Sequence, residues 1–386
     1  MAVGIIAEYN PFHYGHLYHL KRIKEMFPND EIVAIISSSF TQRGEPSIID
    51  KWKKTEICLE AVIDLIIELP YVYSTESADY FSLGALTILE KLKVDKFVFG
   101  SETNDIKIFE KIANIQLTNP DFDKLTKIYM KLGNNYPTSL SLALKDLNGD
   151  ILTLPNDLLG ISYVKIIKEN SFNIKPICIE RKNNYKSDSL EELASGTAIR
   201  KALFEGKVIK EYVPDFVLKY LNDLHFNEDY FKFLKYKIML EDNLDKYQTV
   251  DEGLGYKIKK EITNSKSYDD LINKLKSKRY TYNRLSRMLN HILCGFTKDI
   301  KNNCNNLEYI RVLGFTDKGK EYINRIKKNV DIPIISNYSK NKSEMIKMEF
   351  QATCVYASSL DENKKQELIE KEYIYHPKYK EKMKDE

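Results

Sequence analysis

The sequence predicts an α/β fold in which a parallel sheet is covered by helices and is followed by a mainly helical second part. Early in the chain, short apolar runs alternate with segments of helical periodicity. The apolar runs are continuous, which is typical of strands buried on both faces of a parallel sheet. After Phe204 such runs become rare and helical periodicity dominates. We therefore expect a sheet domain over residues 1–205 and a helical domain over residues 206–386.

Strands and helices alternate along the expected sheet domain. Apolar runs predict strands at Ala2–Ala7, Glu31–Ile36, Val62–Ile67 and Lys96–Phe99. Helical patterns predict helices at His16–Met26, Asp50–Ala61 and Ser77–Leu92, the second with Asp50 as its N-cap. In the second part, apolar residues recur at helical spacing within Tyr282–Leu293, and the charged segment Lys378–Glu386 is expected to be a frayed tail.

Composition excludes several classes of protein. The longest apolar stretch, Ala61–Leu69, contains Asp64 and Glu68, so no segment is apolar enough to cross a membrane. The N-terminus lacks the basic and apolar regions of a secretory signal. The cysteines are scattered and never spaced as CxxC, which argues against a disulfide framework and a zinc site. We expect a cytoplasmic protein with reduced thiols, no metal-binding cluster and no evident protein partner.

Charge is distributed unevenly along the chain. From Lys207 onward there are 35 Lys and Arg residues against 28 Asp and Glu, whereas the preceding part has 24 against 28. Clustered Lys and Arg supply most of the affinity for phosphate backbones, so the asymmetry points to a polyanionic partner for the second part. A lysine-rich solvated surface that binds nothing would give the same numbers.

The strongest local motif lies between the first strand and the first helix, where His13 and His16 flank Gly15. Gly15 has no Cβ and lets a nucleotide approach the backbone closely. The start of the following helix offers N–H groups to phosphates, and imidazoles there can donate hydrogen bonds as charge develops. The alternative is a pair of surface loop histidines. The position after a strand of a parallel sheet favours the nucleotide site, because ligands bind there.

A second motif, Ser195-Gly196-Thr197-Ala198-Ile199-Arg200, combines small hydroxylated residues with an arginine at the start of a helix. Ser195 or Thr197 can cap the helix, and Arg200 can stabilise departing pyrophosphate. An ordinary N-cap with a surface arginine is equally compatible with this motif alone. Together with the histidine turn at the other end of the same expected domain, it favours a phosphate-binding site.

Two further regions carry candidate ligands for substrate or RNA. The loop after the second strand contains Gln42 and Arg43, and the next helix contains Lys51; these side chains can bind a carboxylate or an RNA phosphate, or lie on the surface. The stretch from Leu271 to Lys298 has no acidic residue and interleaves aromatic and basic side chains. We expect an RNA-facing surface there, with Lys278, Arg279, Arg284, Arg287 and His291 as ligands. A plain solvated helix is the alternative.

The HxGH turn resembles the signature of the superfamily of class I aminoacyl-tRNA synthetases and pantetheine and nicotinamide mononucleotide adenylyltransferases. The wider string Glu8-Tyr-Asn-Pro-Phe-His13-Tyr-Gly-His16-Leu-Tyr-His19 resembles the bacterial tRNA(Met) cytidine acetate ligases. Further similar segments span nearly the whole chain: Phe40–Pro46, Asp50–Trp52, Ile67–Pro70, Ser77–Phe81, Phe99–Glu102, Leu154–Asp157, Ser195–Arg200, Tyr280–Phe296 and Arg311–Phe315. Two departures are Tyr14, where the family commonly has Asn, and Ser38-Ser39, where Gly-Asn is usual.

The resemblance implies a Rossmann-like nucleotidyltransferase fold and an ATP site. It implies that His13, His16 and Arg200 are catalytic, and leaves open whether one histidine or both act on phosphate. The ATP-binding residues that it implies are Ile6, Ala7, Glu8, Tyr9, Asn10, Pro11, Phe12, His13, Tyr14, Gly15, His16, His19, Gly100, Asn156, Arg181, Ser195 and Thr197.

The activity implied by the resemblance is ATP-dependent acetylation of a cytidine in elongator tRNA(Met). Acetate and ATP would form acetyl-adenylate, with Mg²⁺ neutralising the phosphates, and the acetyl group would pass to N4 of the wobble cytidine. One alternative is a small-molecule adenylyltransferase, which would not need the basic second part. The other is a non-catalytic RNA-binding protein, against which the intact His13, Gly15, His16 and Arg200 argue.

Overall fold

A computed structural model describes the chain except residues 148, 182–193, 339–342 and 382–386. Its described strands form one sheet in the order β5-β4-β1-β2-β3-β6-β7, with β8 paired to β6. The strand bounds are β1 Ala2–Ala7, β2 Glu31–Ser37, β3 Leu65–Leu69, β4 Lys96–Ser101, β5 Lys175–Glu180, β6 Ile310–Thr316, β7 Ile334–Ile335 and β8 Lys378–Lys380. Strands β1 to β5 are mutually parallel, as predicted.

Helices connect the strands in the first part of the chain, and this alternation confirms the predicted fold class. Their bounds are α1 Tyr14–Met26, α2 Lys51–Glu60, α3 Tyr71–Ser74, α4 Ala78–Lys91, α5 Ile106–Thr118, α6 Phe122–Lys131, α7 Tyr136–Asp146, α8 Pro155–Glu169 and α9 Gly196–Phe204. Asp50 caps α2 as expected, because its carboxylate accepts from the amides of Trp52 and Lys53. The third strand begins later than predicted, because Val62 has a φ of 65° and lies in a turn before Leu65.

The second part of the chain is mostly helical. Its helices are α10 Asp215–Leu218, α11 Phe231–Leu240, α12 Leu254–Ile262, α13 Tyr268–Leu275, α14 Tyr282–Cys294, α15 Lys298–Asn303, α16 Asp317–Ile326, α17 Glu344–Ala357 and α18 Glu362–Ile374, with short 3-10 turns η1 Asn227–Tyr230, η2 Leu244–Lys246 and η3 Lys327–Asn329. Helix α14 matches the predicted Tyr282–Leu293 closely.

The hydrophobic core is divided differently from the expected domains. One cluster of buried residues unites the sheet with residues from Cys294 onward, including Tyr309, Leu313 and Tyr356. A second cluster is confined to residues 230–293, which we call the helical lobe. Strand β6 pairs antiparallel with β3, so the chain returns to the sheet after the helical lobe. Residues 378–380, expected to be frayed, form β8 and pair with β6.

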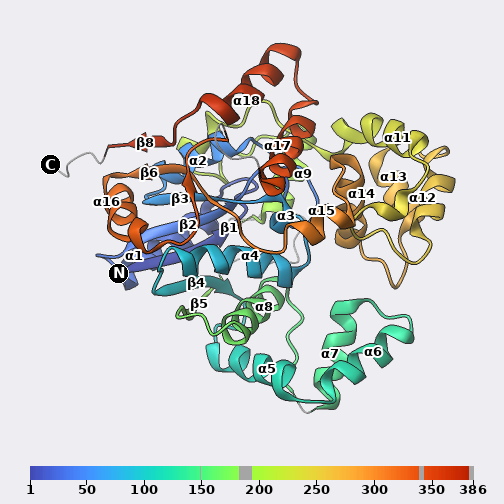
Figure 1. Ribbon diagram of the computed structural model, residues 1–386, viewed down its shortest axis with the longest axis horizontal. Coiled ribbons are helices and arrows are strands. Elements are labelled where there is room, and N and C mark those ends of the chain that lie inside the picture. Colours follow the sequence, from blue (N-terminus) through green and yellow to red (C-terminus); the bar gives the residue numbers. More distant parts are fainter. Residues whose placement is uncertain (148, 182–193, 339–342, 382–386) are drawn as a thin grey trace.

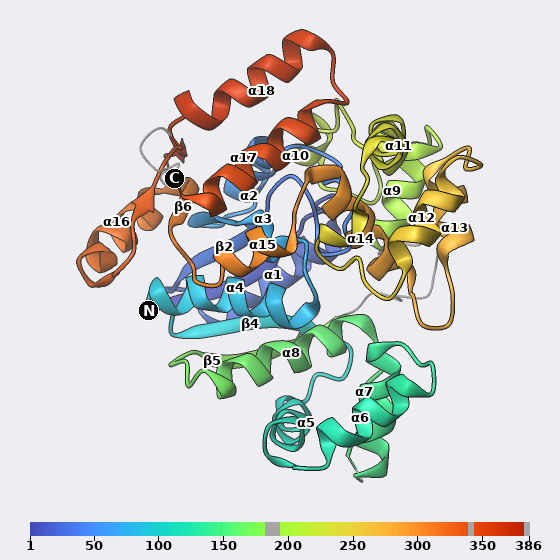
Figure 2. The ribbon, with the colours of Figure 1, turned by 45° about the vertical axis from the view of Figure 1, so that its right-hand side comes forward.

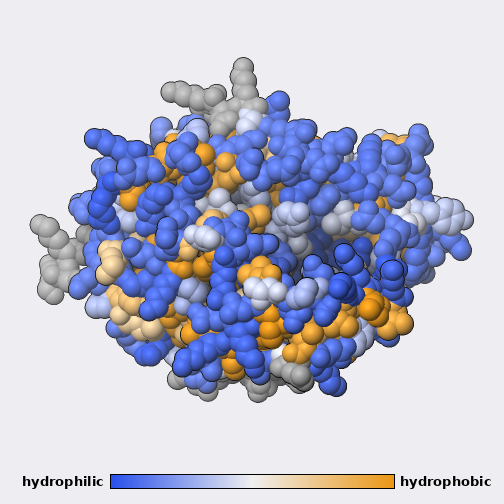
Figure 3. All heavy atoms as spheres, turned by 60° about the horizontal axis from the view of Figure 1, so that its bottom comes forward, coloured by the Kyte–Doolittle hydropathy of each residue, from blue (hydrophilic) through white to orange (hydrophobic). Residues whose placement is uncertain are grey.

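Figure 1 shows the sheet in the middle of the molecule, helices α11–α14 of the helical lobe at the right and helices α5–α7 at the bottom. Figure 2 shows the same separation after rotation, with α16 on the side opposite the helical lobe. The face in Figure 3 is mostly hydrophilic, with its apolar side chains in small separate groups. Within the described residues, no helix is long and apolar enough to span a bilayer.

Candidate active site

The loop after β1 places two imidazoles at the N-terminus of α1. His13 is the N-cap: its Nδ1 accepts from the amide of Gly15 at 3.1 Å, while its own amide donates to Nδ1 of His16 at 3.2 Å. The two rings are stacked, and Tyr9 and Phe12 pack against His16. The predicted HxGH turn is therefore a capping box built from histidines, which fixes the orientation of both rings.

This arrangement also sets the tautomer of each ring. Nδ1 of His13 and Nδ1 of His16 both accept a backbone hydrogen bond, so in the neutral form each proton lies on Nε2. Burial, with Arg181 and Arg200 nearby, lowers the pKa of His13 to about 3. Burial, with His13 and Arg181 nearby, lowers the pKa of His16 well below its usual range. Both rings are neutral at pH 7 and can offer Nε2–H donors to an anion.

His19 lies one turn further along α1. Burial and the guanidinium of Arg181 lower the pKa of its imidazole to about 4, so it is also neutral at pH 7. Its buried Nε2 has no hydrogen-bond partner in the structure. The electrostatic influence of Arg181 on all three histidines places one cation close to the whole turn.

The start of α9 closes the site from a second side. Of the two predicted capping candidates, Ser195 caps this helix, its hydroxyl accepting from the amide of Ala198 at 3.2 Å. Arg200 donates through Nη1 to the carbonyl of Asn10 at 2.8 Å, which connects α9 to the loop after β1. Thr197 lies at the same helix start, with its hydroxyl 3.5 Å from Nη2 of Arg200. The two predicted motifs are thus joined directly.

A third group lies where β4 and β5 end. Gly100 is at the end of β4, and a Cβ there would lie 3.0 Å from Cγ of Arg181. Arg181 follows β5 and donates to the side-chain oxygen of Asn156 at 2.9 Å. Asn156, at the start of α8, in turn donates to Glu102, which follows β4. The structure therefore brings together Gly100, Asn156 and Arg181, at the same edge of the sheet as the HxGH turn.

The 41–46 loop, which follows β2, lines a further side of the candidate active site. The amide of Gln42 donates to the carboxylate of Glu8 at 2.6 Å, and Arg43 donates to the hydroxyl of Thr197 at 3.3 Å. Glu45 accepts from Nη2 of Arg200 at 2.9 Å. The loop thus contacts the strand end, the start of α9 and the predicted catalytic arginine.

Lys51 does not face this site, which corrects the expectation that it binds a substrate carboxylate or tRNA phosphate. Its side chain is 1% exposed, and its Nζ lies 2.5 Å from Glu68 and 3.1 Å from Glu372. Arg311 of β6 pairs with the same two carboxylates. A lysine placed early in α2 points inward here because β3, α17 and α18 supply it with buried carboxylates.

His291 and Arg287 also differ from expectation, because the face of α14 that carries them is covered. His291 is fully buried, with Nε2 2.9 Å from the carbonyl of Thr75, which rules out a direct RNA contact in this structure. Arg287 donates to the carbonyl of Gln42 at 3.3 Å and is partly covered by the 41–46 loop.

The other predicted RNA ligands are more accessible. Lys278 is exposed, and the Arg284 guanidinium stacks 4.8 Å above the ring of Tyr280. Arg279 is partly exposed and forms an ion pair with Glu252, which the absence of acids within 271–298 did not reveal. Lys278 and Arg279 lie in the segment between α13 and α14, and Arg284 lies in the first turn of α14.

Sequence reasoning missed three acidic residues around the site. Glu45 holds Arg200, Glu102 holds Asn156, and the buried Asp157 accepts from the hydroxyls of Ser101 and Thr103. Their positions within the family-like segments Phe40–Pro46, Phe99–Glu102 and Leu154–Asp157 were a usable signal. An isolated carboxylate in a loop carries no local pattern that identifies its partner.

A parallel sheet with an HxGH turn after its first strand, and arginines converging on that turn, defines a nucleotidyltransferase-like protein. A family model described as HIGH Nucleotidyl Transferase matches residues 1–372. The tRNA(Met) cytidine acetate ligase of Caldicellulosiruptor saccharolyticus is 38% identical, over 98% of this chain and 98% of that protein. The ligase of the same name from Caldanaerobacter subterraneus is 40% identical, over 92% of this chain and 94% of that protein.

Solved structures agree with the sequence comparisons. Thermotoga maritima TmcAL in an apo form superposes with a TM-score of 0.91 at 30% identity, over 99% of this chain and 100% of that one. The same protein bound with alpha-thio ATP superposes with a TM-score of 0.89 at 29% identity, over the same shares of both chains. This chain therefore belongs to the HIGH nucleotidyltransferase family and, within it, to the tRNA(Met) cytidine acetate ligases, which confirms the resemblance read from the sequence.

Proposed function

We propose that this chain activates acetate with ATP and transfers the acetyl group to N4 of the wobble cytidine of elongator tRNA(Met). The observation that carries the proposal is the joining of the histidine turn to Arg200 and to the Arg181–Asn156 pair, in a chain similar over its full length to cytidine acetate ligases. ATP is the substrate that fits this edge of the sheet, since it offers an adenine, a ribose and an anionic tail.

In the first step, an acetate oxygen attacks the α-phosphorus of ATP, and the bond to the β-phosphate oxygen breaks. Pyrophosphate leaves and acetyl-adenylate remains. Nε2–H groups of His13 and His16 donate to phosphate oxygens, on which charge develops, and Arg200 holds the departing pyrophosphate. Because these donors are oriented before ATP arrives, little reorganisation is needed during reaction. Arg181 and Asn156 hold the nucleoside side of ATP in this scheme.

In the second step, the cytidine N4 amine attacks the carbonyl carbon of acetyl-adenylate and AMP leaves as the amine loses its proton. The cytidine must leave its stack to reach the anhydride, which an anticodon loop permits. Lys278, Arg279 and Arg284, on the rim formed by the start of α14, are the cations proposed to hold the tRNA backbone. This substrate also supports a cytoplasmic location.

Mg²⁺ would neutralise the phosphates of bound ATP. Across the described residues, no group of three or more His, Cys, Asp or Glu side chains could hold a metal ion. The residues present fit an ion carried by the triphosphate and water rather than a cage built by the protein, as Mg²⁺ prefers.

The decisive experiment incubates the protein with labelled acetate, ATP and tRNA(Met). The proposal predicts label in tRNA only when ATP is present, together with release of AMP and pyrophosphate. Label that enters tRNA only from acetyl-CoA would overturn it. ATP consumption that requires a phosphorylated cofactor precursor instead of acetate would favour a small-molecule adenylyltransferase, and tRNA binding without any ATP consumption would favour a non-catalytic RNA-binding protein.

A further inference from the structure

We propose that Glu45 is a positioning residue that holds the Arg200 guanidinium in the orientation needed for pyrophosphate departure. The inference rests on the proposed function, because it concerns the adenylation step. It assigns a role to a side chain that carries no pattern of its own in the sequence.

Both ends of the Arg200 guanidinium are held. Nη1 donates to the carbonyl of Asn10 at 2.8 Å, and Nη2 donates to Oε2 of Glu45 at 2.9 Å. The side chains of Arg200 and Glu45 are only 17% and 15% exposed, so their charge-assisted hydrogen bond is partly shielded from water. Two acceptors on two terminal nitrogens fix the plane of the guanidinium as well as its position.

The acceptors are themselves fixed by one continuous segment. The side chain of Asn10 accepts from the amide of Ile48 at 2.7 Å. The carbonyl of Glu45 accepts from the amide of Thr41 at 2.9 Å and from its hydroxyl at 3.1 Å, which closes the 41–46 loop. Asn10 and Glu45 are therefore both tied to the continuous segment 41–48.

Helix α14 holds this loop from the opposite side. Gly44 has a φ of 77°, and a Cβ placed there would lie 2.4 Å from the backbone nitrogen of Arg287. The carbonyl of Gln42 accepts from Nη1 of Arg287 at 3.3 Å. The loop is thus packed between α14 and α9, so the helical lobe helps to place Glu45 against Arg200.

Charge indicates what Glu45 contributes. A carboxylate beside Arg200 repels a triphosphate, so it cannot be there to strengthen ATP binding. Its benefit lies in orientation, because an arginine held in place loses less freedom when it stabilises the departing pyrophosphate. Removing the carboxylate should therefore lower the turnover number without weakening ATP binding, whereas a loss of folded structure would weaken both.

The test compares Glu45→Gln with Glu31→Gln. Glu31 pairs with Arg325 at the same 2.9 Å, but at the start of β2, the opposite end of the sheet. We expect Glu45→Gln to lower kcat for acetate-dependent ATP–pyrophosphate exchange about 10-fold or more, with an unchanged or lower KM for ATP. Glu31→Gln should keep the wild-type kcat and KM for ATP. The melting temperatures of the two variants should be similar. An unchanged kcat in Glu45→Gln, or a fall in kcat accompanied by a raised KM, would overturn the proposal.

A second comparison tests whether Glu45 acts through Arg200. In an Arg200→Lys background the forked contact is lost, so adding Glu45→Gln should cause little further loss of exchange. Additive losses would overturn the proposal. Calorimetric titration compares the ATP affinity of the wild type and Glu45→Gln directly, without turnover. If the wild-type chain shows no acetate-dependent exchange, the proposed function and this inference both fail; if it does and Glu45→Gln equals wild type, only this inference fails.

Discussion

The rings of His13 and His16 are stacked with their centroids 3.8 Å apart, and the amide of His13 donates to Nδ1 of His16. Each ring therefore depends on the other for its position. Because both Nδ1 atoms are occupied by backbone donors, the two Nε2–H groups are the donors left for a phosphate. In each ring, Nδ1 supports the turn and Nε2 is the nitrogen proposed to bind phosphate. Substitutions can therefore separate the structural role from the phosphate-binding role.

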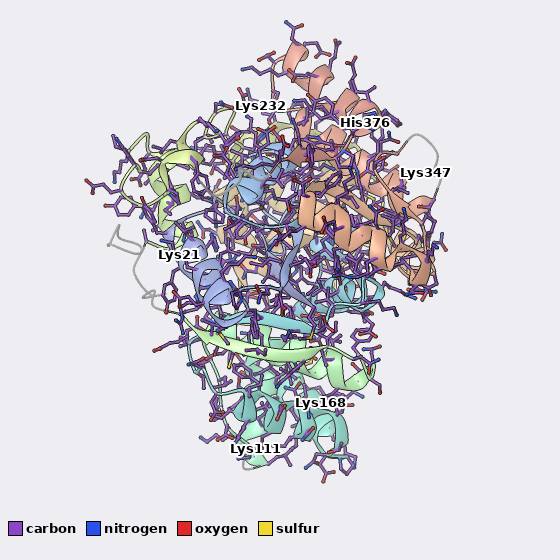
Figure 4. The ribbon with its side chains drawn as sticks, turned by 90° about the vertical axis from the view of Figure 1, so that its left-hand side faces the viewer. Lys21, Lys111, Lys168, Lys232, Lys347 and His376 are labelled. Atoms are coloured by element: carbon purple, nitrogen blue, oxygen red, sulfur yellow. The ribbon has the colours of Figure 1, made fainter. Side chains whose placement is uncertain are left out.

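Replacing His16 by Asn should separate these two roles. The Asn side-chain oxygen can still accept from the amide of His13, but it supplies no donor at the position of Nε2. We expect the rate of acetate-dependent ATP–pyrophosphate exchange to fall about 100-fold or more, with a melting temperature close to that of the wild type. His16→Ala should lose the same activity and also some stability. The exposed His376, labelled in Figure 4, provides the control His376→Ala, which should retain both properties. Full exchange activity in His16→Asn would contradict the proposed donor role.

The neutral state of His13 predicts a pH dependence of stability. Its pKa is lowered to about 3 in the folded chain, first by burial and then by Arg181 and Arg200, whereas the unfolded value is about 6.5. Below pH 6.5 the unfolded chain takes up a proton that the folded chain does not. The free energy of unfolding should therefore fall with decreasing pH, by about 1.4 kcal/mol per pH unit for this residue, until pH approaches 3.

Urea unfolding at several pH values measures this contribution. Between pH 6 and pH 4, His13→Gln should show a slope shallower than wild type by about one proton. His376→Gln, at an exposed position, should keep the wild-type slope. Equal slopes for His13→Gln and wild type would show that His13 is not buried in the neutral form.

Local sequence patterns predicted the parts of the site that depend on local structure. The caps formed by Asp50 and Ser195 lie where polar side chains precede apolar helices, and both are present. Helical spacing predicted α14 and its apolar stripe, but it could not say what covers the opposite face. The 41–46 loop and Thr75 bury His291 and part of Arg287, from positions more than two hundred residues away.

Contacts between residues far apart in the sequence explain the remaining differences between the predictions and the structure. Strand β6 was not expected in the sheet because its partner β3 lies far earlier in the chain, and no local pattern indicates antiparallel pairing across that separation. Lys51 looked like a surface cation because its counter-charges Glu349 and Glu372 come from α17 and α18. Glu45 was missed for the same reason, because its partner Arg200 lies at the end of the distant Ser195–Arg200 motif.

The packing of Gly44 against α14 can be tested with a matched glycine. Gly133 has a φ of 86°, similar to the 77° of Gly44, but a Cβ there would meet nothing within 4 Å. Gly133→Ala should lose only the backbone cost, about 1–2 kcal/mol. Gly44→Ala should lose about 1–3 kcal/mol more, because the methyl group meets the Arg287 backbone, and its exchange activity should fall as the loop shifts. Equal losses in urea unfolding would mean that the loop can yield without cost.

Lys51 should be essential for stability rather than for substrate binding. Among the described residues, Lys51→Met would leave Glu68 and Glu372 paired with Arg311 alone and would remove the ion pair of Glu349. Loss of one partner from a buried ion network costs about 3–5 kcal/mol. Urea unfolding should show this loss, while the folded fraction keeps wild-type tRNA affinity. Lys320→Met, at an exposed position of α16, should change neither property. Weaker tRNA binding by folded Lys51→Met would restore the earlier interpretation.

The rim of α14 should determine the salt dependence of tRNA binding. Lys278→Ala and Arg284→Ala should each weaken binding and reduce the slope of log affinity against log salt by about 0.7–1, because each removes one phosphate contact. Arg279 already shares its charge with Glu252, so Arg279→Ala should have a smaller effect and Glu252→Gln should strengthen binding. Lys320→Ala is the control, since Lys320 belongs to α16 and this helix lies on the side opposite the helical lobe in Figures 1 and 2. Filter-binding titrations at several salt concentrations measure these slopes. The substitutions of Lys278, Arg279, Arg284 and Glu252 could all leave the slope of log affinity against log salt unchanged. In that case the tRNA binds to another surface, and the aromatic and basic residues of 271–298 serve only the folding of the helical lobe.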